Sequence, residues 1–227
     1  MRGLLFSVYL LAILMSGMSQ ERERDFEVWL KASAETSLGD NLDIELEEQL
    51  RLDENASEIK NYFTDVSLKY QLTDHLDLRF ATRFSRVNDN QGEIQGYENH
   101  LRFQTGVGTK HVWNRWRIRN RLVYQHKNEL GLSEAEGDVS QQFVRIRSAW
   151  EYKIRNWSFD PIIRAEYFAP LNKAAAGTDE SIRYGLGTNK DLSDWGKLAL
   201  FFQSENSINS QEPETVHSLY FQFTYVF

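Results

Sequence analysis

The sequence contains no cysteine and only three prolines among its 227 residues. Without cysteine, the chain can form neither a disulfide framework nor a metal site with thiolate ligands, and it cannot carry a lipid anchor on a cysteine. Long apolar runs are also scarce. Beyond the first residues, no stretch stays apolar over the roughly 20 positions that a membrane-spanning helix requires. If the chain enters a membrane, it must do so as a closed sheet, because lipid offers no partners for exposed backbone groups.

An excess of basic charge is absent as well. The 26 lysines and arginines are outnumbered by 33 aspartates and glutamates, which gives a formal net charge of −7. Proteins that bind nucleic acid neutralise phosphates with basic side chains, so this balance argues against a nucleic-acid partner.

The first residues have the layout of an export signal. Arg2 provides a positive start, residues 4–15 are apolar apart from Ser7, and the small residues Gly17 and Ser19 precede a cleavage site before Gln20. This order is typical of a secretory signal peptide. An N-terminal membrane anchor is the alternative, but the apolar run is too short to span a bilayer. We therefore expect residues 1–19 to be a signal peptide and residues 20–227 to be one exported domain.

From Asp25 onward, apolar and polar residues alternate. Phe26, Val28 and Leu30, for example, occupy every second position, with Glu27 and Lys31 on the opposite face. A period of two is typical of strands that are apolar on one face only, whereas a helix would show spacings of three and four. We count eleven such segments, which cover residues 26–35, 42–52, 62–71, 76–85, 100–107, 116–125, 144–153, 159–167, 182–189, 198–205 and 218–227.

Three features favour a membrane barrel over a soluble sandwich or barrel. The segments are long, at about 9 to 13 residues, whereas soluble strands average about 5 to 6. Aromatic residues such as Tyr62, Trp113, Trp150 and Trp195 lie near segment ends, as in interfacial girdles. Short connections alternate with long polar ones, as periplasmic turns alternate with external loops. The expected fold is all-β, a transmembrane antiparallel up-and-down β-barrel of about 10–12 strands that follows the signal peptide.

The last residues form an alternating aromatic strand that ends on phenylalanine. Its aromatic positions are Phe221, Phe223, Tyr225 and Phe227. This pattern resembles the C-terminal signal that the barrel-assembly machinery recognises in outer-membrane proteins. We therefore expect the outer membrane of a Gram-negative bacterium as the location, with outer-membrane lipids and the assembly machinery as partners.

A more specific resemblance comes from a diffuse pattern over most of the mature chain. It comprises Gln49-Leu50-Arg51, Leu68-Lys69-Tyr70 leading to Asp77-Leu78-Arg79, Arg119-Asn120-Arg121-Leu122, Arg145-Ile146-Arg147 and Arg164-Ala165-Glu166-Tyr167. With these motifs the chain resembles the family called domain of unknown function 2490, whose members are predicted outer-membrane barrels. The resemblance implies a fold and a location, but no activity and no catalytic residues.

The strand count contains a conflict. Bacterial single-chain barrels normally have an even number of strands, and the sequence has eleven segments. The rhythm of short and long connections gives ten strands, from residues 43–52 to residues 216–227, with both ends periplasmic. Residues 26–34 are then one segment too many, either an incomplete or extra edge strand or one of twelve.

If the apolar faces contact lipid, the interior is densely charged. The interior positions we single out are Glu45, Glu47, Arg79, Arg83, Arg102, Arg117, Arg119, Arg121, Arg145, Arg147, Glu151, Arg164, Glu166 and Arg183. The favoured interpretation is a largely filled interior in which these charges neutralise one another, in a protein with a structural or surface role. The alternative is a small-solute pore with a weak anion preference, since basic walls favour anions.

The third hypothesis is a lipid-modifying enzyme of the outer membrane. Adjacent His217 and Ser218 would lie on opposite faces of one strand and could not act as a catalytic pair. The five histidines show no metal-ligand spacing. The sequence therefore indicates no catalytic residue, no metal and no cofactor.

Overall fold

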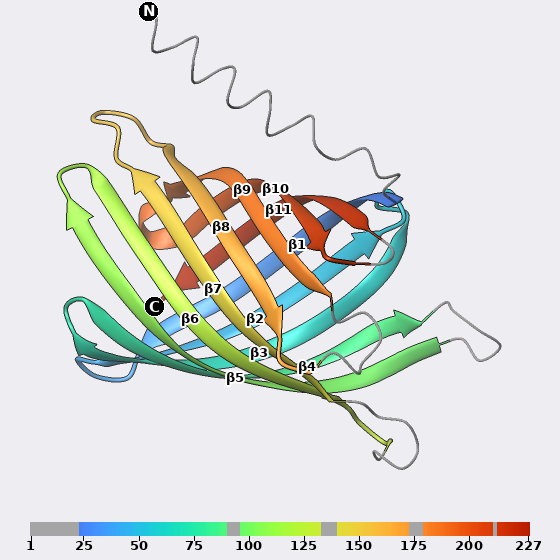
Figure 1. Cartoon of the computed structure of the whole chain (residues 1–227). Coiled ribbons are helices and arrows are strands. Elements are labelled where there is room, and N and C mark those ends of the chain that lie inside the picture. The colour runs from blue at the N-terminus through green and yellow to red at the C-terminus, as the bar shows by residue number, and fades with distance from the viewer. Residues whose placement is uncertain (1–22, 90–95, 133–139, 173–178, 211–212) are drawn as a thin grey trace, which may run out of the picture.

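The computed structural model describes residues 23–89, 96–132, 140–172, 179–210 and 213–227. The predicted signal peptide lies outside these residues. Eleven strands form one closed barrel in up-and-down order (Figure 1). They are β1 (Glu23–Ser37), β2 (Leu42–Asp53), β3 (Glu58–Thr73), β4 (Leu76–Asp89), β5 (Gly96–Trp113), β6 (Trp116–Glu129), β7 (Gln141–Tyr152), β8 (Asp160–Pro170), β9 (Glu180–Asp191), β10 (Lys197–Ile208) and β11 (Glu214–Val226). The predicted all-β barrel is confirmed.

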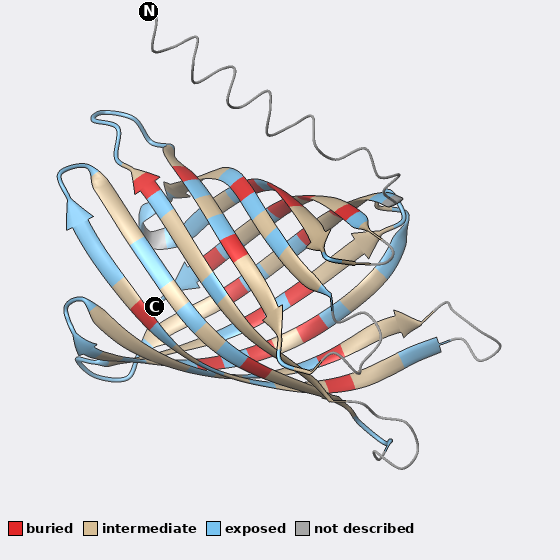
Figure 2. Ribbon diagram, viewed as in Figure 1, coloured by how far each residue is buried: buried red, intermediate tan, exposed pale blue. Residues whose placement is uncertain are grey.

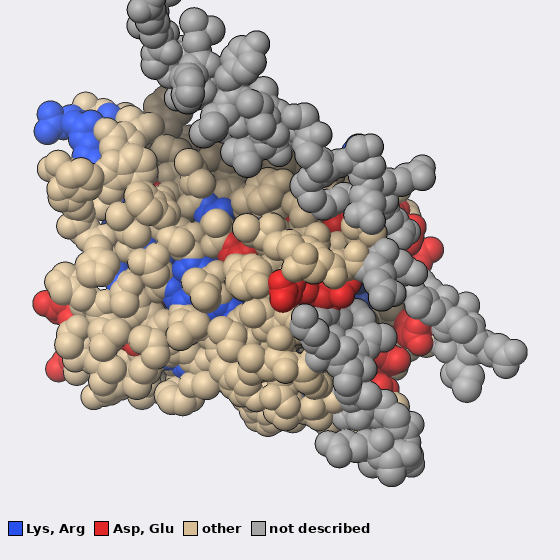
Figure 3. All heavy atoms as spheres, in the orientation of Figure 1, with Lys and Arg blue, Asp and Glu red and all other residues tan. Residues whose placement is uncertain are grey.

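The alternation in sequence becomes an alternation of burial along each strand (Figure 2). Buried positions are mostly polar, and Glu151 and Gln203 are each only 2% exposed. Large apolar side chains such as Leu186 and Phe103 are 61% and 55% exposed. Residues that are neither acidic nor basic cover most of the side shown in Figure 3, and acidic residues gather toward one end. The barrel is therefore polar inside and apolar outside, the reverse of a soluble barrel.

The connections form two groups at opposite ends of the barrel. At the end that we call the turn end lie residues 38–41, 74–75, 114–115, 153–159 and 192–196. Asn114 and Asn156 have positive φ angles of 55° and 60° there, a conformation that asparagine tolerates in tight turns. The opposite end, which we call the loop end, holds the connections that follow β2, β4, β6, β8 and β10. The predicted alternation of short turns and longer connections is thus confirmed for most of the chain.

The barrel closes through a parallel pair. β1 runs parallel to β11, from Glu23 beside Glu214 to Glu35 beside Val226, and antiparallel to β2. The expectation of an incomplete or extra edge strand is therefore wrong, because β1 pairs with β11 over residues 23–35 and with β2 over residues 28–37. The barrel has eleven strands, which confirms the predicted range of about 10–12. An odd number of up-and-down strands necessarily brings the first and last strands together in the same direction.

This closure places the start of β1 and the end of β11 at opposite ends of the barrel. β1 starts at the loop end, whereas β11 finishes at the turn end, where the amide of Phe227 donates to the carbonyl of Glu35 at 3.1 Å. The ten strands predicted from residues 43–52 to residues 216–227 do begin and end on the same side, at the turn end, and β1 is an additional strand that starts at the loop end. No helix in the described residues is long and apolar enough to cross a membrane.

Candidate functional site: the charged interior

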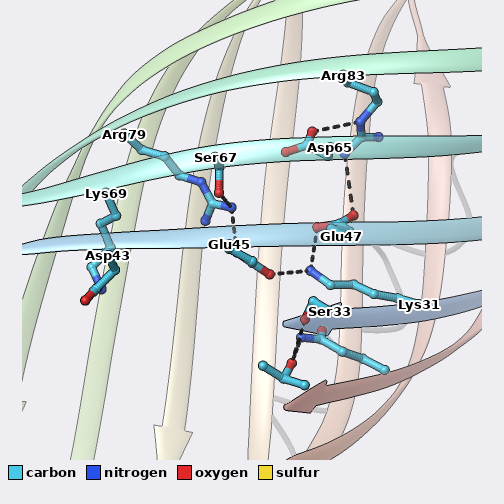
Figure 4. A network of polar contacts seen from close by, with 12 residues as sticks. Lys31, Ser33, Asp43, Glu45, Glu47, Asp65, Ser67, Lys69, Arg79 and Arg83 are labelled. Atoms are coloured by element: carbon cyan, nitrogen blue, oxygen red, sulfur yellow. Dashed lines mark hydrogen bonds and ion pairs between the residues drawn. The ribbon is translucent and has the colours of Figure 1, made fainter. Parts of the chain in front are cut away.

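One side of the interior, formed by β1 to β4, carries a network of matched charges that we call the paired wall (Figure 4). The Lys31 ammonium lies 3.1 Å from a Glu45 carboxylate oxygen and 2.6 Å from one of Glu47. Arg79 donates to Glu45 at 2.8 Å and to the Ser67 hydroxyl at 2.7 Å. Because Lys31, Glu45, Ser67 and Arg79 lie on β1, β2, β3 and β4, the network ties these four strands together across the sheet.

The paired wall continues toward the loop end with the same matching of charges. Arg83 donates to Asp65 at 2.9 Å and lies 3.6 Å from Glu47. Arg102 of β5 approaches the same Asp65 carboxylate at 4.0 Å. Lys60, which pairs with buried Glu27 at 2.6 Å, lies where the β2–β3 register shifts. The irregularity lets Lys60 reach an interior partner from a position that strict alternation assigns to the outside.

Aromatic rings share the interior with these charges. The Arg51 guanidinium lies 3.9 Å from the centre of the Trp29 ring, and that of Arg83 lies 3.4 Å from the Phe63 ring. Arg164 lies 3.7 Å from the Phe201 ring and donates to Gln203 at 2.6 Å. Stacking on rings stabilises cations that have no carboxylate nearby. The Arg183 guanidinium of β9 lies 5.0 Å from the centre of the Trp29 ring of β1, so one ring contact reaches across the β11–β1 seam.

The facing side of the interior, formed by β6 to β8, we call the arginine wall. Between the strand ends it carries two carboxylates, Glu151 and Glu166, and six arginines: Arg117, Arg119, Arg121, Arg145, Arg147 and Arg164. Glu151 accepts from Arg117 at 3.0 Å and from Arg119 at 3.1 Å. Glu166 accepts from Arg145 at 2.7 Å and lies 3.5 Å from Arg183 of β9. Each carboxylate is therefore already shared by two arginines.

Arg121 and Arg147 bind neither of these carboxylates. They lie directly opposite each other on β6 and β7. Neither side chain forms an ion pair, a hydrogen bond or a ring contact with any of the described residues. Arg147 also lies opposite Glu166, but that carboxylate binds Arg145 and Arg183 instead.

The fourteen charged residues predicted from the sequence divide between these clusters. The structure brings Glu45, Glu47, Arg79, Arg83 and Arg102 together on or beside the paired wall, and Arg117, Arg119, Arg145, Glu151, Glu166 and Arg183 into the arginine-rich clusters. Arg164 contacts rings and Gln203, and Arg121 and Arg147 remain without partners. Sequence reasoning left Lys31, Arg51 and the interior rings out of this set. The alternation could have found them, since they occupy the same face as the singled-out charges.

His217 and Ser218 point to opposite faces of β11. The His217 ring stacks on Phe202 at a centroid distance of 5.9 Å, whereas Ser218 is 3% exposed and accepts a hydrogen bond from Gln203 at 3.2 Å. The described residues contain no group of three or more histidine, aspartate and glutamate side chains placed to hold a metal ion. The charged interior is therefore the site with the clearest chemistry: it can bind and orient ions.

Two comparisons bear on what the chain is. A family model described as a protein of unknown function, DUF2490, matches residues 26–216. No curated protein matches the sequence. The match begins in β1 and ends at the third residue of β11, so it spans ten strands and the start of the eleventh.

Proposed function

The chain belongs to the DUF2490 family, and we propose that it is an integral outer-membrane β-barrel whose charged interior is largely filled by its own ion pairs. The observation that carries the proposal is the inverted distribution of side chains, apolar outside and charged inside. Water would disfavour this exterior at about 25 cal/mol per Å² of apolar surface, whereas lipid covers it without that penalty. A structural or surface role follows from a filled interior.

The size of the strands fits a bilayer. A strand of 12 residues, such as β7 or β10, rises about 40 Å and covers about 30 Å when tilted by about 40°. That height equals the thickness of a typical hydrocarbon core.

Exposed aromatic residues at the turn end support the same placement. Trp113, Trp157 and Trp195 are 68%, 60% and 76% exposed there, and Trp116 and Tyr152 pack against each other beside them. Amphipathic rings at one level of a barrel are typical of the girdle at a membrane–water interface. We propose that the turn end faces the periplasm and that lipids contact the apolar exterior.

Cell fractionation tests this placement. The mature protein should appear in the outer-membrane fraction with Gln20 as its first residue, because the export signal would be removed after Ser19. In unheated gel samples the folded barrel should migrate differently from the boiled chain. Recovery as a soluble periplasmic protein would contradict the proposal.

The C-terminal strand offers a second test, of the proposed partnership with the assembly machinery. Phe227 both ends the aromatic pattern and hydrogen-bonds to β1 at the closing seam. We expect Phe227→Asp to reduce the folded form in outer membranes several-fold, whereas the control Phe227→Tyr should assemble normally. Equal assembly of the two variants would argue against a signal that includes Phe221, Phe223, Tyr225 and Phe227.

The second candidate function is a small-solute pore with a weak anion preference. The arginine excess on β6 to β8 favours it, because basic walls attract anions. Planar-bilayer recordings separate the two functions. A filled interior predicts little or no conductance from the unmodified protein, and a steady anion-selective conductance would establish the pore.

A further inference from the structure

We propose that Arg121 and Arg147 form a binding site for a small oxyanion, a phosphate or a carboxylate, on the interior face of β6 and β7. The inference deepens the proposed function by naming what the charged interior binds. The inference rests on the proposed function in one respect, the access of a solute to the interior. Oxyanion binding is measured in detergent and the outer-membrane location is measured in cells, so the binding site and the proposed location can fail separately.

The first step in the argument is the position of the two side chains. They are register partners in an antiparallel pair, so their Cβ atoms lie roughly 4.5–5.5 Å apart on the same face. Like charges directly opposite each other on neighbouring strands destabilise a sheet. Such a pair is stable when something negative lies between the two cations.

The second step is that the protein supplies no such group. Glu151 binds Arg117 and Arg119, and Glu166 binds Arg145 and Arg183. Asp77 and Glu45 attract Arg121, and Glu166 attracts Arg147, only from a longer range than an ion pair. Arg79 of β4 adds repulsion to both arginines from the facing wall. The local surplus is therefore positive, although the whole chain is negative.

The third step is chemical. A guanidinium presents a planar fork of N–H donors that matches two oxygens of a carboxylate or phosphate. Two such forks on adjacent strands can bind one oxyanion between them, which replaces a repulsion by two charge-assisted contacts. Chloride is a single atom and offers no pair of oxygens to either guanidinium, so it fits the two arginines less well.

The neighbouring strand limits where the ligand can bind. Arg121 lies opposite Gly108 of β5, and Gly108 lies opposite Asp77. A Cβ at Gly108 would come within 2.6 Å of the Asp77 carboxylate, so this carboxylate lies over the glycine. An oxyanion must therefore bind on the β7 side of Arg121, between the two arginines.

Calorimetric titration of the purified full-length barrel in detergent tests the site, with inorganic phosphate and acetate as probes and chloride as the reference at equal ionic strength. We expect at least one of the two oxyanions to bind at least ten-fold more tightly than chloride. Arg121→Gln and Arg147→Gln should each weaken that binding at least ten-fold. The double variant should lose little more, because both residues serve one site. Arg117→Gln, which removes a paired arginine from the same strand, should change the affinity less than three-fold.

Thermal unfolding supplies a readout that a merely structural role would not give. In chloride, Arg121→Gln should unfold at a higher temperature than the unmodified barrel, because it removes a repulsion. The better oxyanion should raise the midpoint of the unmodified barrel but not that of the variant. Arg147→Gln provides the same test from the opposite strand if Arg121→Gln folds poorly. Binding of chloride as tight as that of both oxyanions, or an equal loss in Arg117→Gln, would overturn the inference.

Discussion

The two walls of the interior differ in how their charged side chains are neutralised. On the paired wall, lysines and arginines meet carboxylates on neighbouring strands, as Lys31 meets Glu45 and Glu47. On the arginine wall, Glu151 and Glu166 each bind two arginines, and three further arginines, Arg121, Arg147 and Arg164, form no ion pair with the described residues. Both walls place charged residues at the same two-residue spacing, but the paired wall has more carboxylates and its ion pairs include lysines as well as arginines.

The contrast assigns the walls different roles. A matched network holds strands together but leaves no net charge to attract a solute. A surplus of arginines weakens the sheet locally and creates a field that attracts anions. We infer that the paired wall stabilises the barrel, and that the arginine wall carries whatever selectivity the interior has. Breaking each wall separately should therefore give different results.

The largest effect is expected from Asp65→Asn on the paired wall. Asp65 is 3% exposed, and its loss leaves Arg83 without its closest counterion. Removing one partner of a buried pair costs roughly 3–5 kcal/mol, and some hydration of the interior should bring the loss to about 3 kcal/mol. Urea unfolding in detergent micelles measures it.

The matched control is Asp77→Asn on β4, whose carboxylate forms no ion pair within the described part of the barrel and has one buried oxygen without a partner. This variant should lose less than about 1 kcal/mol. Losses of the same size in both variants would mean that the specific Asp65–Arg83 contact does not matter.

An intermediate effect is expected from Glu151→Gln on the arginine wall. Glu151 is 2% exposed, but its partners Arg117 and Arg119 have side chains that are 32% and 48% exposed and can turn to solvent. We expect a loss of about 1–2 kcal/mol, smaller than that of Asp65→Asn, because hydration screens the released arginines. Added phosphate should restore part of it in the same unfolding assay. A loss equal to that of Asp65→Asn would remove the distinction between the two walls.

A gain in stability is expected from Arg121→Glu. The new carboxylate faces Arg147 directly, so a repulsive pair becomes an attractive one, and the gain should be about 1 kcal/mol. The same variant should no longer bind an oxyanion. Arg117→Glu is the control of opposite sign, since it places a second carboxylate directly opposite Glu151 and should destabilise the barrel. If Arg121→Glu destabilises as well, then Arg121 has a favourable contact that the pairing of β6 and β7 does not explain.

How far the sequence predicts this arrangement differs between local and long-range features. Alternation depends only on a residue's own strand, so it correctly predicted the barrel and the polar side of each strand. The pairing of β1 with β11 joins residues about 190 positions apart, as in the hydrogen bond from Ser33 to Thr224, and no local pattern encodes it. The up-and-down order and the range of about 10–12 strands were predicted correctly, but the expectation of an even strand number left the place of the first segment open.

The choice of ion partners could not be predicted either. Register places Glu166 opposite both Arg147 and Arg183, but Glu166 forms ion pairs with Arg183 and with the diagonal Arg145 rather than with Arg147. Lys60 was missed because the register shift near Leu52 breaks the period of two. Composition shows the overall negative charge of the chain, whereas the positive surplus of one wall appears only when the strands are placed around the barrel.

The smallest effect is expected at the solvent-accessible edge of the paired wall, with Lys69→Gln. Lys69 pairs with Asp43 at 2.6 Å, but their side chains are 34% and 25% exposed, near the turn end. Water and salt screen such a pair, so its loss should cost about 0.5 kcal/mol or less. The small loss should shrink further in high salt, whereas the loss from Asp65→Asn should change little, because burial shields that pair from ions. Parallel unfolding curves at low and high salt measure both. A loss for Lys69→Gln as large as that for Asp65→Asn would show that burial does not set the strength of the network, and that the paired wall acts as one unit from the turn end to the loop end.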